Sequence, residues 1–356
     1  MTFEPPPRKD FSLMLDSGAH ALFNMHIRDQ AIPDYAFLRG EHFRTYLHNY
    51  GSFCAQYKDK INVPVNLDVI FNPRETWHVQ KHLENHYGIQ PLPVYHFGED
   101  IKWLHRYMDE YEYIGIGGLG QYISRSAYTK FADRVFKILE DGGNKWKTHG
   151  FAMTSIDLAY RYPWYSVDST TWLKLAIYGR CLIPRFNPNG EAILTKSPRV
   201  VSFSLHRMNK ADSYFRMSPL EQDRMQRQAH RWGHHIDEET PPSLTASTAA
   251  RSTFNMIYLI HVSNQDGAPR FYMAGNGRKS EESDTFHRME HDCGVLVSFW
   301  DVCRSGNPVL RLRRLLDDSY EIKSDIELAL SDGQTNKILK AKRKRKRGFS
   351  TLGDTE

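Results

Sequence analysis

The sequence predicts an α/β protein built on a (β/α)8, or TIM-like, barrel with insertions and a basic C-terminal tail. In the first half of the chain, short runs rich in Val, Ile and Leu alternate with longer amphipathic stretches. This alternation is typical of βα units around a buried parallel sheet. Six such units at regular spacing favour a barrel over an open sheet. A Rossmann sheet would need a glycine fingerprint after its first strand, and the chain has none there.

Each apolar run bounded by turn residues is expected to be a strand, and each amphipathic stretch a helix. The expected strands cover residues 12–16, 63–70, 92–97, 112–116, 148–153 and 164–168. The expected helices cover residues 34–57, 74–87, 99–109, 126–141 and 155–161.

After residue 185 the alternation loosens, which indicates insertions. We expect a loop or hairpin at 185–200, a strand at 200–205, a charged helix at 218–232, a loop at 237–242 and a helix at 244–263 that would help to close the barrel. Two later apolar runs, Arg270–Ala274 and Gly294–Trp300, are expected to be strands of a small appendage. The predicted organisation is a barrel domain over residues 1–330 and a polar, disordered tail over residues 331–356.

The composition is that of a soluble globular protein, with 40% hydrophobic and 25% charged residues. No apolar run reaches the length of a membrane span, and no signal peptide precedes the first strand. Four cysteines without CxxC spacing favour a reducing compartment, so we expect a cytoplasmic protein, or one in the host cytoplasm if a phage encodes it. The net charge of +5 permits a polyanionic partner without requiring one.

Two expected strands end in an acid followed by a serine. The first end reads Asp16-Ser17-Gly18-Ala19, and the second reads Asp168-Ser169. Carboxylates delivered to one rim of a barrel can be tuned apart, so that one stays ionised and the other moves a proton. The alternative is that each aspartate caps the following helix, because Asp and Ser are favoured N-cap residues.

A third strand end carries glycines, in Gly117-Gly118-Leu119-Gly120. Glycine lets the backbone approach a flat ligand closely and leaves its N–H and C=O groups free to bind the edge of a heterocycle. The alternative is a tight turn between a strand and a helix.

The order of these three motifs, with His149-Gly150-Phe151-Ala152-Met153 before the last, resembles that of the tRNA-guanine transglycosylase superfamily of the queuine and archaeosine types. The family's motifs are an Asp-Ser-Gly-Gly loop, a Gly-Gly-Leu loop and a Phe-Asp-Cys or Phe-Asp-Ser loop, which is Val167-Asp168-Ser169 here. The resemblance covers residues 12–185 and is greatest to the branch of phages and bacteria that inserts 7-deazaguanines into DNA.

The resemblance implies a base exchange in which Asp168 is the nucleophile at C1′ of a guanosine nucleotide and Asp16 handles the proton of the base. It also implies which residues surround the base. These are Ser17, Gly18, Gly117, Gly118 and Leu119 around its edge, His20 stacked on it, Phe151 or Met153 covering the other face, and Asp68 as a pocket residue. For Asp68, capping of the following helix is the open alternative, and for His96 and His149 we expect structural roles.

The chain departs from the family at several points. It has no cluster of closely spaced cysteines for a structural zinc, so no cofactor or metal is expected; His230, His234 and His235 with Cys293 or Cys303 would have to supply a site. The family's second glycine is Ala19, and Gly-Gly-Leu is followed by Gly120-Gln121-Tyr122 instead of an acid. The missing carboxylate favours a base without a cationic arm, such as preQ0.

We therefore expect a nucleic-acid guanine transglycosylase that inserts a 7-deazaguanine, with DNA favoured over tRNA as the acceptor. A tRNA-guanine transglycosylase and a non-catalytic nucleic-acid-binding barrel are the alternatives. Phosphate contacts are expected from six consecutive basic residues, Lys342, Arg343, Lys344, Arg345, Lys346 and Arg347. No feature of the sequence indicates the oligomeric state or the recognition sequence.

Overall fold

The computed structural model describes residues 12–26, 34–118, 124–153, 155–274 and 294–299. The chain divides into two compact units, Met1–Asp301 and Val302–Glu356. The second unit, which includes the basic run, lies outside the described residues. The description below concerns the first unit.

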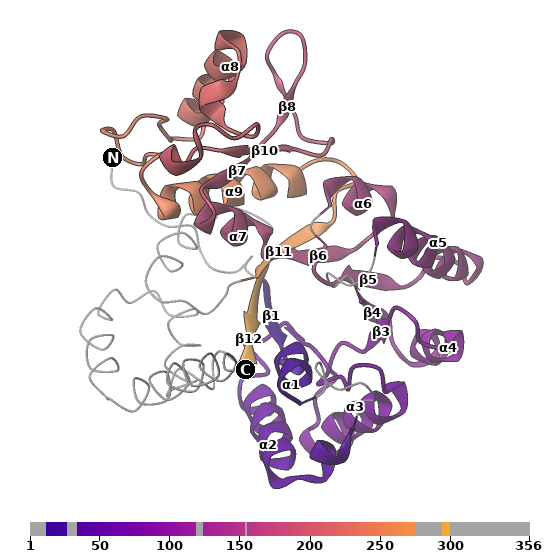
Figure 1. Cartoon of the computed structure of the whole chain (residues 1–356). Coiled ribbons are helices and arrows are strands. Elements are labelled where there is room, and N and C mark those ends of the chain that lie inside the picture. The colour runs from indigo at the N-terminus through magenta and orange to yellow at the C-terminus, as the bar shows by residue number, and fades with distance from the viewer. Residues whose placement is uncertain (1–11, 27–33, 119–123, 154, 275–293, 300–356) are drawn as a thin grey trace, which may run out of the picture. The chain divides into compact units, whose positions relative to one another are not determined.

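The described part of the chain is a mixed α/β fold around a parallel sheet (Figure 1). Its eight strands are β1 (Ser12–Asp16), β2 (Val63–Pro64), β3 (Val94–His96), β4 (Tyr113–Gly117), β5 (Lys147–Gly150), β6 (Ser166–Ser169), β11 (Arg270–Ala274) and β12 (Gly294–Ser298). They pair in the order β2-β1-β12-β11-β6-β5-β4-β3, and every ladder is parallel. The mixed α/β class with a parallel sheet, which the sequence predicts, is therefore confirmed.

The backbone next to β2 also meets the backbone next to β3. Val65 and Leu92 form an isolated parallel bridge. The N–H of Leu92 donates to the carbonyl of Pro64 at 2.7 Å, and the N–H of Asn66 donates to the carbonyl of Leu92 at 3.0 Å. These bonds join the end of β2 and the residues after it to Leu92, two residues before β3.

Each of the first six strands leads into one or more helices. They are α1 (Ala19–His26) and α2 (Glu41–Gln56) after β1, α3 (Pro73–Tyr87) after β2, α4 (Ile101–Glu110) after β3, α5 (Arg125–Asp141) after β4, α6 (Ile156–Arg161) after β5 and α7 (Thr171–Ile177) after β6. Side-chain caps begin three of them, from Asn72 to α3, Asp100 to α4 and Ser124 to α5. The helix predicted at 34–57 is divided at Gly40, which separates α2 from a short 3-10 turn.

An insertion lies between α7 and α9 (Thr248–Ser263), the helix that precedes β11. It contains the antiparallel pairs β7 (Arg180–Ile183) with β10 (Arg199–Ser202) and β8 (Arg185–Phe186) with β9 (Ala192–Ile193). Two 3-10 turns (Leu205–Arg207 and Tyr214–Arg216) and α8 (Pro219–Arg231) complete it. Its small core includes Cys181, Phe203 and Met225, and it takes in Phe254 of α9, so the insertion packs on a helix of the main fold.

The expectation that Arg270–Ala274 and Gly294–Trp300 form an appendage was wrong. As β11 and β12, these runs lie side by side between β6 and β1, inside the main sheet (Figure 1). The insertion separates them from the first six strands along the sequence, and this separation hid their place in the sheet.

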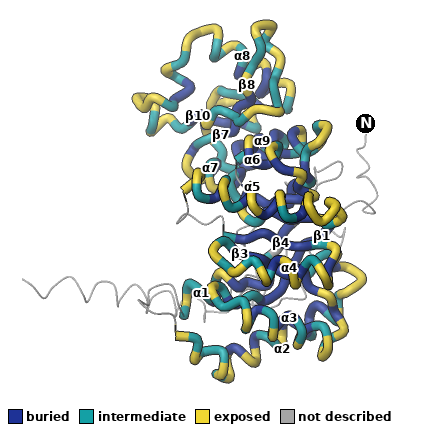
Figure 2. The backbone as a smooth tube through the Cα atoms, turned by 90° about the vertical axis from the view of Figure 1, so that its right-hand side faces the viewer, coloured by how far each residue is buried: buried dark blue, intermediate teal, exposed yellow. Residues whose placement is uncertain are grey.

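The two faces of the sheet carry different cores. Ile114, Val167 and Phe271 face the helices within the larger core cluster. Met14, Tyr272 and other residues of alternate positions form a second cluster on the opposite face. Figure 2 shows that the strands consist mainly of buried residues, whereas the helices carry exposed residues as well as buried ones. Each Leu, Phe or Met side chain buried in this way contributes about 1.5–3 kcal/mol.

This alternation also places the aspartates. Asp16 is two residues beyond Met14, and Asp168 is the register partner of Tyr272. Residues two apart on a strand, and register partners on neighbouring parallel strands, lie on one face of the sheet. Both aspartates therefore lie on the face of the second cluster, at the carboxyl ends of their strands.

Candidate active site

Three aspartates, each in or after a different strand, come together at the edge of the sheet formed by the carboxyl ends of the strands, which we call the rim. Asp16 ends β1, Asp68 follows β2, and Asp168 lies in β6. The pKa of the Asp16 carboxyl is raised to about 7, first because burial disfavours its charged form and then because Asp68 and Asp168 repel its charge. Hydrogen bonds from the N–H of Gly18 and the hydroxyl of Ser298 oppose this rise. At neutral pH, Asp16 can therefore both donate and accept a proton.

The carboxylate of Asp168 is fixed by a backbone donor from the neighbouring strand. Its Oδ1 accepts a hydrogen bond of 2.7 Å from the N–H of Ala152, just after β5. Ala152 has φ 54°, in the left-handed region that costs a residue with a Cβ about 1–3 kcal/mol. Asp168 is 6% exposed. The carboxylate is thus buried and held by a strained turn, and it caps no helix, because Thr170 is the N-cap residue of α7.

A buried histidine lies beside Asp168. The Nε2 atom of His149 is 3.4 Å from Oδ1 of Asp168. Its Nδ1 is 2.7 Å from the hydroxyl of Ser166, which in turn is 2.5 Å from the hydroxyl of Tyr113. The ring of Phe151 packs edge-on against that of His149, with centroids 4.5 Å apart. This chain of contacts fixes the imidazole against the strand that carries Asp168.

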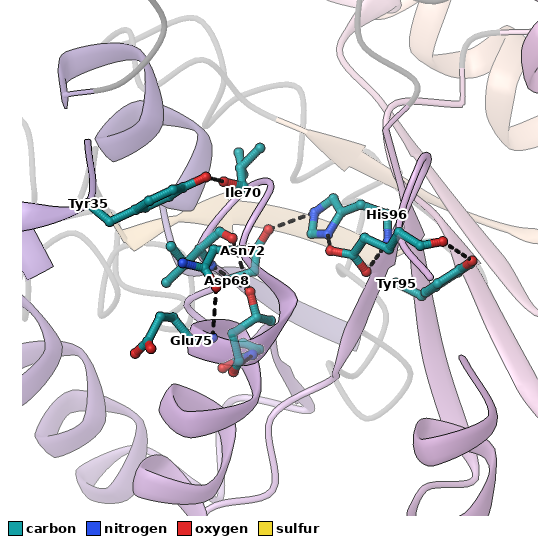
Figure 3. A network of polar contacts seen from close by, with 11 residues as sticks. Tyr35, Asp68, Ile70, Asn72, Glu75, Tyr95 and His96 are labelled. Carbon is teal, nitrogen blue, oxygen red and sulfur yellow. Dashed lines mark hydrogen bonds and ion pairs between the residues drawn. The ribbon is translucent and has the colours of Figure 1, made fainter. Parts of the chain in front are cut away.

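Asp68 is paired with a histidine rather than with a helix end. Figure 3 shows Asp68 and His96 pointing toward each other, and Oδ2 of Asp68 is 2.7 Å from Nε2 of His96. Asn72, and not Asp68, caps α3 by accepting a hydrogen bond from the N–H of Glu75. The loop between β2 and α3 is further held by Thr76, whose hydroxyl bonds both the N–H and the carbonyl of Val69. Of the two sequence interpretations of Asp68, helix capping is excluded.

The glycines at the end of β4 make room for neighbouring side chains. A Cβ on Gly117 would lie 2.7 Å from the His96 ring, and one on Gly118 would lie 2.7 Å from Cβ of Phe97. Gly118 also has φ 95°, a conformation that favours glycine. Gly117 is buried. The glycine pair thus seats His96 at the rim; Leu119, the third residue of the motif, lies outside the described residues.

The remaining sequence-predicted residues are placed as follows. Ser17 is fully buried, and its hydroxyl donates to the carbonyl of Asn66 at 2.8 Å, which ties the end of β1 to the end of β2. Gly18 has φ 81° and begins the turn into α1, where the exposed His20 contacts Asn24. Phe151 packs on the second core cluster, beside the rim, whereas Met153 is 1% exposed within the cluster that faces the helices.

A small pocket lies beside Asp68. It is lined by Ala19, Leu22, Phe23, Phe37, Phe43, Asp68, Val69 and Ile70, from α1, the segment before α2, α2 and the loop after β2. Its volume is about 10 Å³, close to that of one water molecule. A purine is far larger, so we do not assign the base to this pocket.

Sequence reasoning missed three residues of this site. His96 and His149 were expected to be structural, yet each lies within 3.4 Å of a rim carboxylate. Glu99 was not singled out, and its Oε1 lies 3.2 Å from Nδ1 of His96. The signal that could have found both histidines is their position at or near the end of a strand, which is shared with the aspartates.

The described residues contain no group of three or more His, Cys, Asp or Glu side chains arranged to hold a metal ion. Of the residues named for a zinc site, Cys293 and Cys303 lie outside the described part, and Nδ1 of His234 is 2.7 Å from the carbonyl of Trp232. Among the helices described, none has the length and apolar character needed to cross a membrane.

Comparison of the chain with models of protein families, with curated proteins and with solved structures finds no match.

Proposed function

We propose that this protein is a nucleic-acid guanine transglycosylase that replaces guanine with a 7-deazaguanine through a covalent aspartyl intermediate. The observation that carries the proposal is the pairing of two unlike carboxyls on one rim. Asp168 is held by a backbone N–H, and Asp16 has its pKa raised to about 7. Exchange at an anomeric carbon needs one carboxylate as nucleophile and a second group that moves protons to and from the base.

We also propose that the sheet closes into a barrel, as this function would require. The eight parallel strands, the first six of which lead into helices, have the strand count of a (β/α)8 barrel. The bridge between Val65 and Leu92 joins the two ends of the pairing order, which is what closure of the sheet requires. In such barrels, the active site lies at the carboxyl ends of the strands. Asp16, Asp68 and Asp168 all lie at that end.

In the first half of the reaction, a carboxylate oxygen of Asp168 attacks C1′ of the target nucleotide. The bond from C1′ to N9 breaks, its electron pair passes to the guanine, and protonated Asp16 supplies the proton that the leaving base takes up. In the second half, the incoming base gives its N9 proton to Asp16, and N9 attacks C1′ and displaces Asp168. Each half returns what the other consumed, so no further reactant is needed.

DNA is the acceptor that we propose, because the chain lacks the family's closely spaced cysteines and carries the run of six basic residues. The target base must leave its stack to reach a rim at the end of a barrel, at a cost of a few kcal/mol from a duplex. The base that we propose is uncharged outside its ring, as in preQ0.

Trapping of the intermediate tests the chemistry. The purified protein is mixed with a guanine-containing DNA oligonucleotide or with tRNA, denatured, and analysed for a protein–nucleic acid adduct. We expect an adduct with the wild type and none with Asp168→Asn. Asp133→Asn is the matched control, since Asp133 is exposed on α5 and paired with Arg161. An adduct that persists in Asp168→Asn would remove the nucleophile assignment.

Mass spectrometry of nucleosides tests the substrates. DNA and tRNA are isolated from cells that express the protein and supplied with preQ0. We expect a 7-deazaguanine nucleoside in DNA that is missing with Asp168→Ala. The same nucleoside in tRNA alone would make the protein a tRNA-guanine transglycosylase instead.

A further inference from the structure

His96 lies between two carboxylates at the rim. Its Nε2 is 2.7 Å from Oδ2 of Asp68, and its Nδ1 is 3.2 Å from Oε1 of Glu99 (Figure 3). The second oxygen of Glu99 accepts a hydrogen bond of 3.0 Å from the N–H of His96. A tight turn brings Glu99 back to the histidine, because Gly98 has φ 90° and the N–H of Glu99 donates to the carbonyl of His96.

These contacts favour the imidazolium form of His96. Each ring nitrogen faces a carboxylate oxygen, and only the protonated ring carries an N–H on both nitrogens. Burial alone would lower the pKa of His96, but Asp68 and then Glu99 outweigh it and raise the pKa to about 10. Asp68 therefore has a fixed cation beside it throughout the neutral pH range.

The three rim carboxyls have unlike partners. Asp68 has the His96 cation, and Asp168 has the N–H of Ala152 with His149 nearby. Among the described residues, the donors to Asp16 are neutral, namely the N–H of Gly18 and the hydroxyl of Ser298, and no Lys, Arg or His of that part of the chain forms an ion pair with it.

Other groups around this set come from several elements. Tyr50 of α2 lies near Asp16 and Tyr107 of α4 lies near Asp68 and Glu99, and the pKa of each phenol is raised by burial, so both are neutral at pH 7. Ser298 of β12 carries no charge. The charged groups of the described residues that act most on Asp16 are therefore the other two aspartates, Asp68 and Asp168.

We propose that His96 is a positioning residue: its imidazolium holds the Asp68 carboxylate beside Asp16, and the charge of Asp68 helps Asp16 to keep a proton near neutral pH. The inference deepens the proposed function, on which it rests for the use made of that proton. Without the imidazolium, Asp68 loses this ion pair and its carboxylate is no longer held beside Asp16, so its repulsion of the charge of Asp16 is weakened.

Titration of the carboxyls in the free protein tests this assignment. Protein with ¹³C-labelled aspartate side chains is titrated by NMR, and signals are assigned by single Asp→Asn changes. In the wild-type background, we expect the signal that titrates near neutral pH to vanish with Asp16→Asn. In the His96→Gln background, we expect the Asp16 signal to titrate at a lower pH than in the wild type. His86→Gln, an exposed change on α3, is the matched control and should leave the titration of Asp16 as in the wild type.

An Asp16 signal that titrates at the wild-type pH in His96→Gln would overturn the proposal. If His96→Gln does not fold, the variant Asp68→Asn tests the proposal instead. Asp68→Asn alone removes the neighbouring anion, and we expect the pKa of Asp16 to fall by about one unit or more. An unchanged Asp16 titration in Asp68→Asn would overturn the proposal as well.

The exchange assay separates this inference from the proposed function. Titration needs no substrate, so the expected carboxyl assignments without any base exchange would remove the function and leave the role of His96. Exchange by the wild type, with the Asp16 titration unchanged in His96→Gln, would remove the role of His96 and leave the function. Where both hold, we also expect the pH profile of exchange to change in His96→Gln and to stay unchanged in His86→Gln.

Discussion

The N–H of Ala152 donates a 2.7 Å hydrogen bond to Oδ1 of Asp168 from a backbone conformation that few residues other than glycine adopt. The side chain of Ala152 is exposed, so packing of this side chain does not explain the conformation. Strain of this kind persists where the surrounding structure enforces it, and it is common at active sites. The turn after β5 thus serves to aim one N–H at the carboxylate that we propose as nucleophile.

A pair of substitutions at Ala152 separates the conformation from the side chain. We expect Ala152→Gly to keep exchange activity and to change the free energy of unfolding by less than about 1 kcal/mol, since glycine accepts φ 54°. Ala152→Val should cost about 1–3 kcal/mol, because a β-branched residue resists this region, and should reduce exchange as the N–H moves away from Asp168. Denaturant unfolding and an exchange assay measure both effects. Equal stability and activity of the two variants would show that the turn is not strained.

The raised pKa of Asp16 predicts a stability change with a definite sign. The pKa is about 7 in the folded state, against 3.8 for an ordinary aspartate, so the folded protein binds the proton more tightly than the unfolded chain does. Stability from this group is therefore complete below about pH 4 and declines as the pH rises through about 7, above which the loss levels off. Asp16→Asn removes the ionisation and should stabilise the protein by about 1–3 kcal/mol at pH 8, allowing for the partial exposure of the side chain.

Urea unfolding at pH 5, 6, 7 and 8 measures this gain, which should grow with pH and then level off. Asp133→Asn is the control, and it should lower the free energy of unfolding instead of raising it. The reason is that the hydrogen bond with Arg161 lowers the pKa of Asp133, so the ionised form of this carboxyl favours the folded state. A gain from Asp16→Asn that is the same at every pH would contradict the assignment. The same variant should lose about 10²- to 10⁴-fold in exchange, which is the usual contribution of a proton-transfer group.

Gly117→Ala should disturb the rim through His96. The added Cβ would lie 2.7 Å from Cδ2 of the ring and 3.1 Å from a methyl group of Val94. We expect a loss of about 1–3 kcal/mol in the free energy of unfolding, as is usual when a packed site is overfilled. The loss should be smaller in a His96→Ala background, where the ring is absent. A double-mutant cycle by urea unfolding measures this coupling, and strictly additive losses would show that the glycine does not make room for His96.

The first six strands and the strand-end positions of Asp16 and Asp168 could be predicted from the sequence, because an apolar run followed by an acid is a local signal. The predicted strand 12–16 matches β1 residue for residue, and Asp16 is its last residue. The expected strand at 63–70 was too long: β2 covers Val63–Pro64, and beyond the single bridge at Val65 the chain is already a loop held by Asn66 and Thr76.

The pairing of Asp68 with His96 could not be predicted, because it depends on which strands are neighbours. The two residues are brought together by the backbone bridge between Val65 and Leu92, and Glu99 joins them through the turn at Gly98. Met153 shows the same limit. It was expected to cover the base, but the turn at Ala152 intervenes between it and the strand, and its side chain lies among the residues that face the helices.

The last prediction concerns the basic run Lys342–Arg347, which lies outside the described residues. Six adjacent cations repel one another and have no apolar neighbours with which to pack, so the sequence predicts a solvated segment that contacts phosphates. Deletion of residues 340–356 should weaken binding to DNA of many sequences alike. It should also flatten the dependence of log K on log salt by up to about 0.9 per lost phosphate contact.

A variant of the whole chain with all six basic residues changed to Gln should behave like the deletion, since the effect depends on the charge of the segment and not on its length. Exchange at saturating substrate should survive in both, because Asp16 and Asp168 are intact. Fluorescence anisotropy at several salt concentrations measures the slope, and an unchanged affinity and slope in both variants would exclude a nucleic-acid role for the run.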